Sequence, residues 1–340
     1  MARATKMNKI TSPELLAQVN QKNTELKNEY LNYLRAINRS EGTIKQYNSD
    51  LDIFFVWVLQ HAGNKEFIRI TKRDIITFQG WLINDNGNSP ARVRRIKASI
   101  SSLSNFCENI LADEDPDYAG FRSIVKKIEN PQMQAVREKT VWENEELEDL
   151  LDKLVNAGRY EQACFVALGM YGGRRKAEIC RFKISDFDDD KLICGGALYK
   201  SDPILTKGNK YLECYTLAKK FKPYLDLWIK YRNDNGIDSE WLFPDHHDRN
   251  MTLRGSTVNS WANTFTRLTG KDFYPHSLRH FFVSALSREG IPDSVVVEIL
   301  GWSSSEMFKI YNDNSKDETI AMFFKDGEIC APQQVQLSSL

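Results

Sequence analysis

Residues 275–280 read Pro-His-Ser-Leu-Arg-His and open a helical pattern that we expect to run from His276 to Glu289. Residues three apart share one face of a helix, so His276 and Arg279 should point to the same side. An imidazole and a guanidinium presented together can exchange a proton and hold an anion. Such a pair also arises by chance in many proteins, and its meaning depends on the motifs around it.

Three further motifs occur in a fixed order along the chain. Gly173-Arg174-Arg175-Lys176-Ala177-Glu178 follows an apolar run, and Thr206-Lys207-Gly208-Asn209-Lys210 is typical of a hairpin turn. Leu300-Gly301-Trp302 follows the helix, with Tyr311 nine residues beyond the tryptophan. Each motif alone has an ordinary explanation, such as a surface Arg–Glu pair or a core tyrosine. Their joint occurrence in this order is far more specific.

The combined pattern resembles the tyrosine site-specific recombinases, or phage integrase family, over residues 22–325. The resemblance implies a mainly α fold of two domains, in the simple layout of Cre and Xer proteins. The first would be a core-binding bundle of four or five helices that binds DNA. The second would be a mixed α catalytic domain with a small antiparallel β-sheet. It further implies an enzyme that cleaves and rejoins DNA strands without a metal, ATP or any other cofactor.

The chemistry of phosphodiester cleavage explains the residue types in the pattern. Arg175 and Arg279 are suited to hold the non-bridging oxygens of the phosphate, because a guanidinium binds two oxygens at once. Tyr311 would be the covalent nucleophile, although a phenol with a pKa near ~10 needs help to lose its proton at neutral pH. By resemblance, His276 assists that proton transfer and contacts the phosphate, while Lys207 is the general acid for the leaving 5′-oxygen.

Three residues are expected to support the reacting groups. Trp302 stands where many relatives have His, and it should orient and pack, because an indole can only donate a hydrogen bond. Glu178 should hold the first arginine or its neighbours in place. His280, which follows the second arginine, is expected to be structural.

Two assignments within the site have alternatives. The gap from Arg175 to Lys207 is longer than in compact Xer-type relatives, so Lys200 or Lys210 could replace Lys207 as the general acid. Arg174 adjoins Arg175, but the spacing Arg-x-x-Glu favours Arg175.

Helical periodicity and turn residues predict the organisation of the chain. We expect a flexible N-terminus over 1–20, a core-binding domain over 21–130, a linker over 131–139, a catalytic domain over 140–328 and a tail over 329–340. Within the first domain, one helix is expected to begin with Thr71 as its N-cap and the next to follow Ser89-Pro90. Two strands are expected at 187–193 and 205–217, the second split by a turn at 207–209, and short helices at 121–128 and 316–324.

The fourth helix of the first domain is strongly basic, with Arg92, Arg94, Arg95 and Lys97 within six residues. A solvated surface is the ordinary explanation of such a cluster. The alternative is a helix that lies against DNA phosphates or in a major groove. Since the resemblance implies a DNA-binding domain here, we expect Arg92, Arg95 and Ser99 to contact DNA, with Lys45 on the second helix adding to the surface.

Composition is compatible with these expectations but does not demand them. The net charge is zero; residues 1–140 hold 21 Lys and Arg against 16 Asp and Glu, and the remainder 25 against 30. Six scattered cysteines indicate neither a disulfide framework nor a zinc site, so no metal is expected. No apolar run predicts a membrane span or a signal peptide. A cytoplasmic, nucleoid-associated protein is therefore expected.

The predicted function is site-specific DNA recombination through a 3′-phosphotyrosyl intermediate. The expected partners are double-stranded DNA with an inverted-repeat site and a homo-tetramer assembled on it. A type IB topoisomerase or a telomere resolvase would use the same nucleophile. A DNA-binding regulator without activity is the alternative from another class, and the intact set of Arg175, His276, Arg279 and Tyr311 argues against it. The sequence indicates neither the target site nor whether the exchange is integration, excision, inversion, transposition or dimer resolution.

Overall fold

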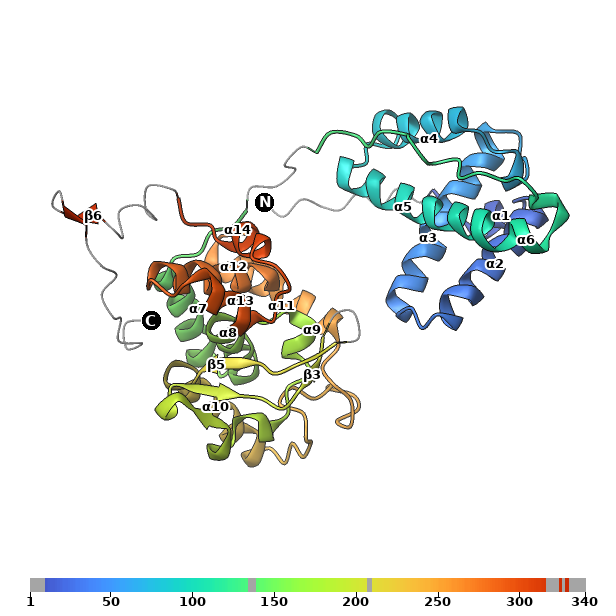
Figure 1. Cartoon of the computed structure of the whole chain (residues 1–340). Helices are drawn as coiled ribbons and strands as arrows, with labels where there is room; N and C mark the ends of the chain where they lie inside the picture. Colours follow the sequence, from blue (N-terminus) through green and yellow to red (C-terminus); the bar gives the residue numbers. More distant parts are fainter. Residues whose placement is uncertain (1–9, 134–138, 207–209, 316–323, 326–327, 330–340) are drawn as a thin grey trace. The chain divides into compact units, whose positions relative to one another are not determined.

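The computed structural model describes residues 10–133, 139–206, 210–315, 324–325 and 328–329. Helices dominate these residues, and the strands are short and antiparallel (Figure 1). Chain contacts divide them into two compact units, with the boundary immediately before Lys139. The predicted fold class, mainly α with two domains and a small antiparallel sheet, is confirmed. No described helix is both long and apolar enough to cross a lipid bilayer.

Four long helices form the first unit, and side-chain caps fix where each of them begins. The caps are Asn20, Ser40, Thr71 and Ser89, and each accepts a hydrogen bond from a backbone N–H in the first helical turn. The helices are α1 (Pro13–Leu16), α2 (Gln21–Ala36), α3 (Glu41–His61), α4 (Lys72–Asn84), α5 (Pro90–Phe106) and α6 (Ala112–Glu114). Tight turns lie at Phe67–Arg69 and Pro116–Tyr118, and a π-helical turn at Cys107–Leu111.

Aromatic side chains of α3 fill the centre of the first unit. Phe54, Phe55 and Trp57 are almost fully buried, and the ring of Phe54 lies edge-on to those of Phe67 and Phe78. Helix α3 packs against both α2 and α5. The core thus fixes the two helices that carry the predicted DNA contacts.

The segment 10–20, which we expected to be part of a flexible N-terminus, instead packs on the first unit. It contains α1, and Val19 is 9% exposed against the core. The Asn20 N–H donates to Asn64 Oδ1 at 2.9 Å, and Asn64 Nδ2 donates to the carbonyl of Gln18 at 2.9 Å. These contacts join residues more than forty positions apart, which is why local composition did not predict them. Residues 1–9 lie outside the described residues.

Helices surround a small sheet in the second unit. The helices are α7 (Asn144–Asn156), α8 (Tyr160–Gly172), α9 (Lys176–Ile179), α10 (Ala218–Asp234), α11 (Gly255–Thr269), α12 (Pro275–Arg288), α13 (Asp293–Leu300) and α14 (Glu306–Tyr311). The sheet has the order β1 (Leu192–Ile193), β2 (Leu198–Lys200), β5 (Tyr215–Leu217). Two-stranded pairs are β3 (Ile204–Leu205) with β4 (Tyr211–Leu212), and β6 (Phe324–Lys325) with β7 (Glu328–Ile329).

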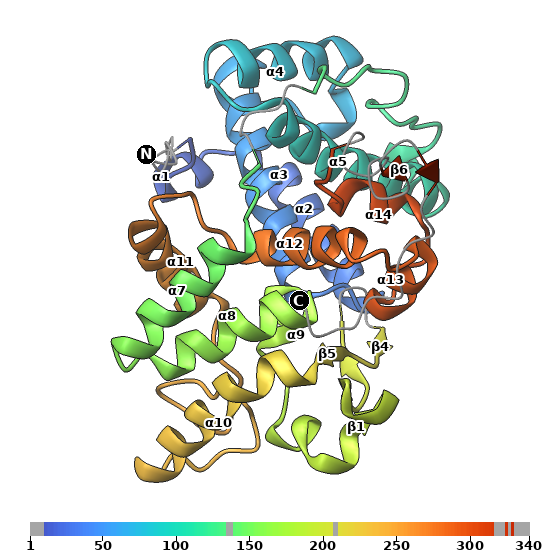
Figure 2. The same ribbon diagram turned by 90° about the vertical axis from the view of Figure 1, so that its left-hand side faces the viewer.

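Helix α8 is the centre of the second unit. It is buried continuously from Ala163 to Gly172 and packs against α7, α10 and α12 (Figure 2). A helix that is apolar on all sides requires neighbours on all sides. Its C-terminal end leads directly into the Arg174-Arg175 motif, so the core of this unit sets the position of the first arginines.

The strand expected at 187–193 is wrong for most of its length. The chain forms two 3₁₀ turns, Ile184–Phe187 and Asp189–Lys191, and only Leu192–Ile193 is a strand. Three consecutive aspartates at 188–190 favour turns, because their side chains compete for local backbone N–H groups. The strand expected at 205–217 has β3 before and β4 after the predicted turn, and the part after the turn is divided further into β4 and β5.

Candidate active site

The predicted nucleophile and its predicted helper meet where α12 begins and α14 ends. His276 lies in the first turn of α12, and Tyr311 is the last residue of α14. The Tyr311 hydroxyl lies 2.7 Å from His276 Nε2. The phenol is mostly enclosed, with 6% of the residue exposed. The geometry therefore provides a direct hydrogen bond along which the phenolic proton can leave.

The surroundings of His276 keep its imidazole neutral. Burial, together with the nearby His280, Arg279 and Arg175, lowers the pKa of His276 from 6.5 to about 4. At neutral pH the ring therefore carries one proton and offers its other nitrogen as an acceptor. A neutral imidazole next to a phenol is the arrangement that general-base assistance requires.

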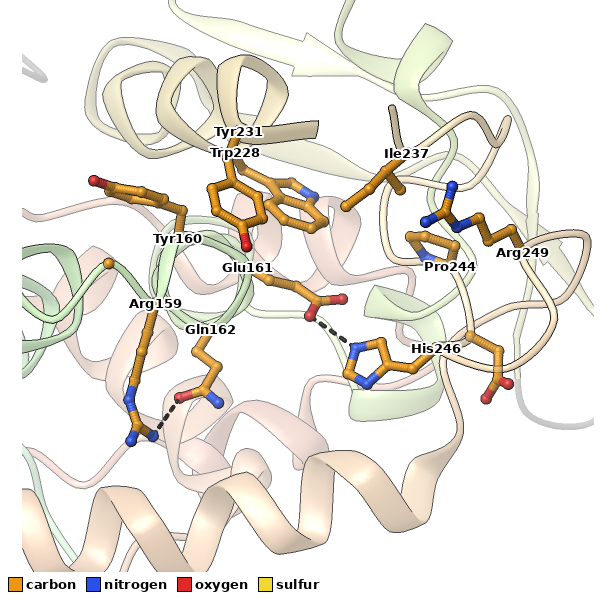
Figure 3. A pocket seen from close by; sticks show the side chains of 12 residues that line it. Arg159, Tyr160, Glu161, Gln162, Trp228, Tyr231, Ile237, Pro244, His246 and Arg249 are labelled. Carbon is orange, nitrogen blue, oxygen red and sulfur yellow. Dashed lines mark hydrogen bonds and ion pairs between the residues drawn. The ribbon is translucent and has the colours of Figure 1, made fainter. Parts of the chain in front are cut away.

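Another histidine of this unit provides a contrast. His246 lies in a separate pocket of about 320 Å³, which none of the predicted catalytic residues lines (Figure 3). Its Nε2 lies 2.9 Å from Glu161 Oε2, and this hydrogen bond raises the pKa of His246 above 6.5. The pKa values of His276 and His246 are thus shifted in opposite directions.

We expect the pH titration of the two imidazoles, followed by heteronuclear NMR of the free protein, to separate them. His276 should titrate near pH 4 and His246 above 6.5, with His276→Gln identifying the first signal. Because folding lowers the pKa of His276, the unfolded state binds more protons between pH 6.5 and about 4. His276 therefore lowers the free energy of unfolding as the pH falls through this window. A midpoint for His276 at or above that of His246 would contradict the expectation.

Glu178 lies between the two predicted arginines. Its Oε1 accepts from Arg175 Nη1 at 2.8 Å, and its Oε2 lies 3.8 Å from Arg279 Nη1. The Arg175 N–H also donates to Glu178 Oε2 at 3.0 Å. Burial by itself would raise the pKa of Glu178, but the hydrogen bonds from Arg175 and the two guanidinium charges hold it below its usual value. An ionised Glu178 thus orients both arginines.

Gly173 links the two arginine segments. It ends α8 with a left-handed backbone, φ +61°, and its carbonyl accepts from Arg279 Nη1 at 3.0 Å. A Cβ at this position would lie 2.3 Å from the ring of Phe282. Only glycine therefore permits α8 to approach α12 this closely and still deliver Arg175 to the site.

Several buried donors at the site have no hydrogen-bond partner among the described residues. They are Arg279 Nε, Arg279 Nη2 and Trp302 Nε1. The guanidinium of Arg279 lies 5.0 Å from the Trp302 ring centre and 5.4 Å from that of Tyr311. Burial and the nearby Arg175 lower the pKa of Arg279 to about 10, so it stays charged at neutral pH. Buried unpaired donors are costly, and several beside one phenol indicate a site shaped for an anion.

The two adjacent arginines differ in their surroundings. Arg174 is buried, with 1% of the residue exposed, and its Nη2 donates to the carbonyl of Ile299 at 2.6 Å. The Arg175 side chain is 30% exposed. Arg174 therefore joins α8 to α13, and Arg175 is the one that can reach a ligand.

Lys207 lies outside the described residues, as does the rest of the 207–209 turn. Strand β4 lies against the start of the Gly301-Trp302 segment, because a Cβ on Gly301 would lie 2.6 Å from Leu212 Cδ1. Of the alternatives, Lys200 forms an ion pair with Glu213 at 2.9 Å. Among residues with described positions, no group of three or more His, Cys, Asp or Glu side chains could hold a metal ion.

The predicted DNA contacts on α5 surround a buried carboxylate that the sequence did not reveal. Asp50 of α3 is 0% exposed, and its Oδ1 accepts from Arg92 Nη1 at 2.5 Å. Ser99 is also 0% exposed and donates to Asp50 Oδ2 at 3.0 Å. Ser99 as a DNA contact is therefore wrong, since its hydroxyl is enclosed and occupied. Arg95 keeps half of its side chain exposed, and Lys45 is exposed.

Two other cations of α5 are structural. Lys97 is 7% exposed, and its Nζ donates to the carbonyls of Ile128 and Glu129 at 2.8 and 2.7 Å. Arg94 donates to the carbonyl of Pro131 at 2.7 Å. The basic run on α5 therefore holds the chain that follows the first unit's core as well as presenting Arg95.

We expect Asp50→Ala to lower the free energy of unfolding of the full chain by roughly 2–3 kcal/mol. The substitution removes the carboxylate that accepts from the buried Ser99 hydroxyl and from the partly buried Gln46 amide, and it leaves Arg92 without its counterion. Urea denaturation followed by circular dichroism measures the change. Asp117→Asn serves as the control, because its pair with Lys22 is long and both side chains are exposed. Equal effects of the two variants would contradict the assignment of Asp50 as an anchor.

The model of the phage integrase family matches residues 140–318. The SPbeta prophage-derived recombinase-like protein YomM of Bacillus subtilis (strain 168) is 29% identical, over 81% of this chain and 81% of its own length. The tyrosine recombinase XerA of Pyrococcus horikoshii is 25% identical, over 85% of this chain and 89% of its own length.

Solved structures of low sequence identity share the fold. The XerH site-specific recombinase bound to palindromic difH substrate, in a post-cleavage complex, matches with a TM-score of 0.66 and 20% identity. That match covers 91% of this chain and 86% of the XerH chain. A lambda integrase dimer bound to a core site matches with a TM-score of 0.61 and 15% identity, over 84% of this chain and 96% of its own.

Proposed function

On the premise that this chain belongs to the phage integrase family, and is a site-specific DNA recombinase, we propose that it works through a covalent 3′-phosphotyrosyl bond to Tyr311. The observation that carries the proposal is the 2.7 Å contact between the Tyr311 hydroxyl and His276 Nε2. Next to it lie the unpaired donors of Arg279 and Trp302, which support a role in binding a phosphate group.

The cleavage step follows from these groups. The phenolic proton of Tyr311 passes to neutral His276, and the phenolic oxygen forms a bond to phosphorus. Arg175 and Arg279 hold the non-bridging oxygens, and the Trp302 N–H adds a donor as negative charge develops. The bond from phosphorus to the 5′-oxygen breaks, and that oxygen takes a proton from Lys207.

Rejoining is the reverse of cleavage with a different strand. The 5′-hydroxyl of the partner strand gives its proton to Lys207 and attacks the phosphorus, the bond from phosphorus to the Tyr311 oxygen breaks, and His276 returns its proton to Tyr311. One phosphodiester bond is exchanged for another, so the cycle requires neither ATP nor another cofactor.

The proposed partners are double-stranded DNA with an inverted-repeat site and a homo-tetramer of this chain. Among similar solved structures, XerH is bound to a palindromic substrate, and lambda integrase forms a tetramer on a Holliday junction. For this chain we propose DNA contacts by Lys45, Arg92 and Arg95; Arg92 donates to Asp50, and Arg95 Nε lies 3.7 Å from the same carboxylate. A DNA substrate implies a cytoplasmic, nucleoid-associated protein.

Covalent capture tests the proposal. The protein is mixed with DNA from the neighbourhood of its own gene, adducts that survive denaturant are collected, and the attached 3′ ends are sequenced. Mass spectrometry of the digested adduct should place the nucleotide on Tyr311. Adducts at one inverted-repeat site are expected, whereas binding without any adduct favours the inactive regulator.

A second assay separates the enzymes that share this nucleophile. Plasmids that carry two captured sites should yield products with exchanged flanks. Relaxation of supercoiled DNA without exchange would indicate a type IB topoisomerase, and closed hairpin ends would indicate a telomere resolvase.

A further inference from the structure

The three residues that follow Tyr311 form hydrogen bonds with α12. Helix α14 has only six residues, too few for a helix to be stable on its own, so its placement depends on such contacts. The hydrogen bonds are those of Asn312 Nδ2 with Ser287 Oγ at 3.2 Å, the Asp313 N–H with Ser284 Oγ at 2.8 Å, and Asn314 Nδ2 with the Ser284 carbonyl at 3.1 Å.

The carboxylate of Asp313 is the centre of this attachment. Its side chain is 7% exposed, and Oδ2 lies 3.1 Å from His280 Nδ1. The ring of His280 in turn lies against that of Tyr311, with 4.6 Å between centres. Burial by itself would raise the pKa of Asp313, but the close contact with His280 and the charge of Lys139 hold it below its usual value. The carboxylate therefore stays ionised and contacts the Nδ1 edge of the His280 ring, which in turn packs against Tyr311.

Lys139 reaches the same segment from the start of the second unit. Its Nζ lies 3.3 Å from Asp313 Oδ1 and donates to the carbonyl of Ile310 at 3.0 Å. The next residue is attached elsewhere, since Thr140 Oγ1 donates to the carbonyl of Asp272 at 2.7 Å. Lys139, the last residue of the predicted linker, thus contacts residues on both sides of Tyr311.

We propose that Lys139, Asp313 and His280 are positioning residues that set the place of the Tyr311 phenol, and that Lys139 ties this placement to the interdomain linker. The inference rests on the proposed function, because the position of the Tyr311 phenol affects strand cleavage only if Tyr311 is the nucleophile. None of the three touches the reacting phosphorus. Lys139 and Asp313 act through α14 and His280 through the ring of Tyr311. Reactions in an active site are sensitive to the position of the nucleophile, and a displacement of about 1 Å costs on the order of 10²-fold.

The test uses full-length variants and two independent readouts. The first is the ¹⁹F NMR signal of 3-fluorotyrosine placed at position 311, which reports the surroundings of the phenol in the free protein. The second is the single-turnover rate of covalent adduct formation at saturating DNA, measured with an ordinary substrate and with one that carries sulfur at the leaving 5′ position. Sulfur leaves without protonation, so a rate defect that persists with it lies with the nucleophile and not with the general acid.

We expect Lys139→Met to shift the ¹⁹F signal and to slow adduct formation by about tenfold with both substrates, and Asp313→Asn to slow it by about 10–100-fold. DNA affinity and melting temperature should change little for Lys139→Met, whose side chain is 54% exposed. Lys139→Arg should restore most of the rate. The double variant should be less impaired than the product of the two single effects, because both changes disrupt the same contact.

Thr140→Val is the matched control, since it loosens the neighbouring residue without a contact to α14. If Lys139→Met behaves as Thr140→Val in both readouts, the positioning role is overturned. If the ¹⁹F signal moves in Lys139→Met alone but wild-type protein forms no adduct with any DNA, the proposed function fails and the positioning of Tyr311 stands.

Discussion

Tyr311→Phe is expected to abolish covalent capture of DNA, lowering strand cleavage by roughly 10⁴-fold or more, because it removes the atom that bonds to phosphorus. The variant keeps the ring and its contacts with His280 and Trp302, so packing around the site should persist. Affinity for the captured site should stay within about twofold, since phosphate contacts elsewhere supply most of the binding. Gel analysis of denatured adducts and a binding titration at fixed salt measure the two quantities.

Tyr211→Phe is the control for this substitution. Tyr211 lies on β4 of the same unit and is 67% exposed, so loss of its hydroxyl should affect neither cleavage nor affinity. Adducts that form with Tyr311→Phe at the wild-type rate would show that another residue is the nucleophile.

Arg279→Lys is expected to slow cleavage by about 10²–10³-fold while the protein stays folded. A lysine keeps the positive charge but replaces the planar guanidinium by a single ammonium group. It therefore cannot donate hydrogen bonds to both the Gly173 carbonyl and a phosphate oxygen. The loss should fall on the rate at saturating DNA, because we expect the unpaired Nη2 to donate to the charge that develops in the transition state. Single-turnover kinetics over a range of DNA concentrations separate rate from affinity.

The neighbouring arginines supply the comparison for Arg279→Lys. Arg175→Lys should slow cleavage to a similar degree, because Arg175 also faces the site beside Glu178. Arg174→Lys should instead lower the melting temperature, since its guanidinium binds the Ile299 carbonyl in the interior. A cleavage defect in Arg174→Lys as large as that of Arg175→Lys, without loss of stability, would reverse the assignment of the two.

Features set by neighbouring residues in the chain were the ones that the sequence predicted well. The cap at Thr71 and the Ser89-Pro90 start of α5 depend on side chains within one helical turn, and the helices begin where these residues indicate. The helix expected at 121–128 is wrong. The Ile124 N–H donates to Ser104 Oγ, a partner twenty residues away that no local pattern identifies. The helix expected at 316–324 lies mostly outside the described residues, and its last residue belongs to β6.

The same distinction applies to the candidate site. Motif order suggested which side chains to bring together, and the structure brings His276, Arg279 and Tyr311 together. Nothing near Ser99 in the sequence indicates that Asp50, forty-nine positions earlier, takes its hydroxyl. A buried carboxylate among basic residues is found only after folding, because its charge is balanced by residues of another helix.

The unpaired donors of Arg279 and Trp302 limit how this protein can be made more thermostable. Buried donors without an acceptor lower the free energy of unfolding of the DNA-free protein. Substitutions that supply an internal acceptor, or that replace these side chains with apolar ones, would raise it. Selection for heat resistance alone would therefore favour the removal of the very groups on which turnover depends. Laboratory evolution of this chain needs selection for DNA exchange in every round, and stabilising changes are better sought on surfaces away from α12 and α14.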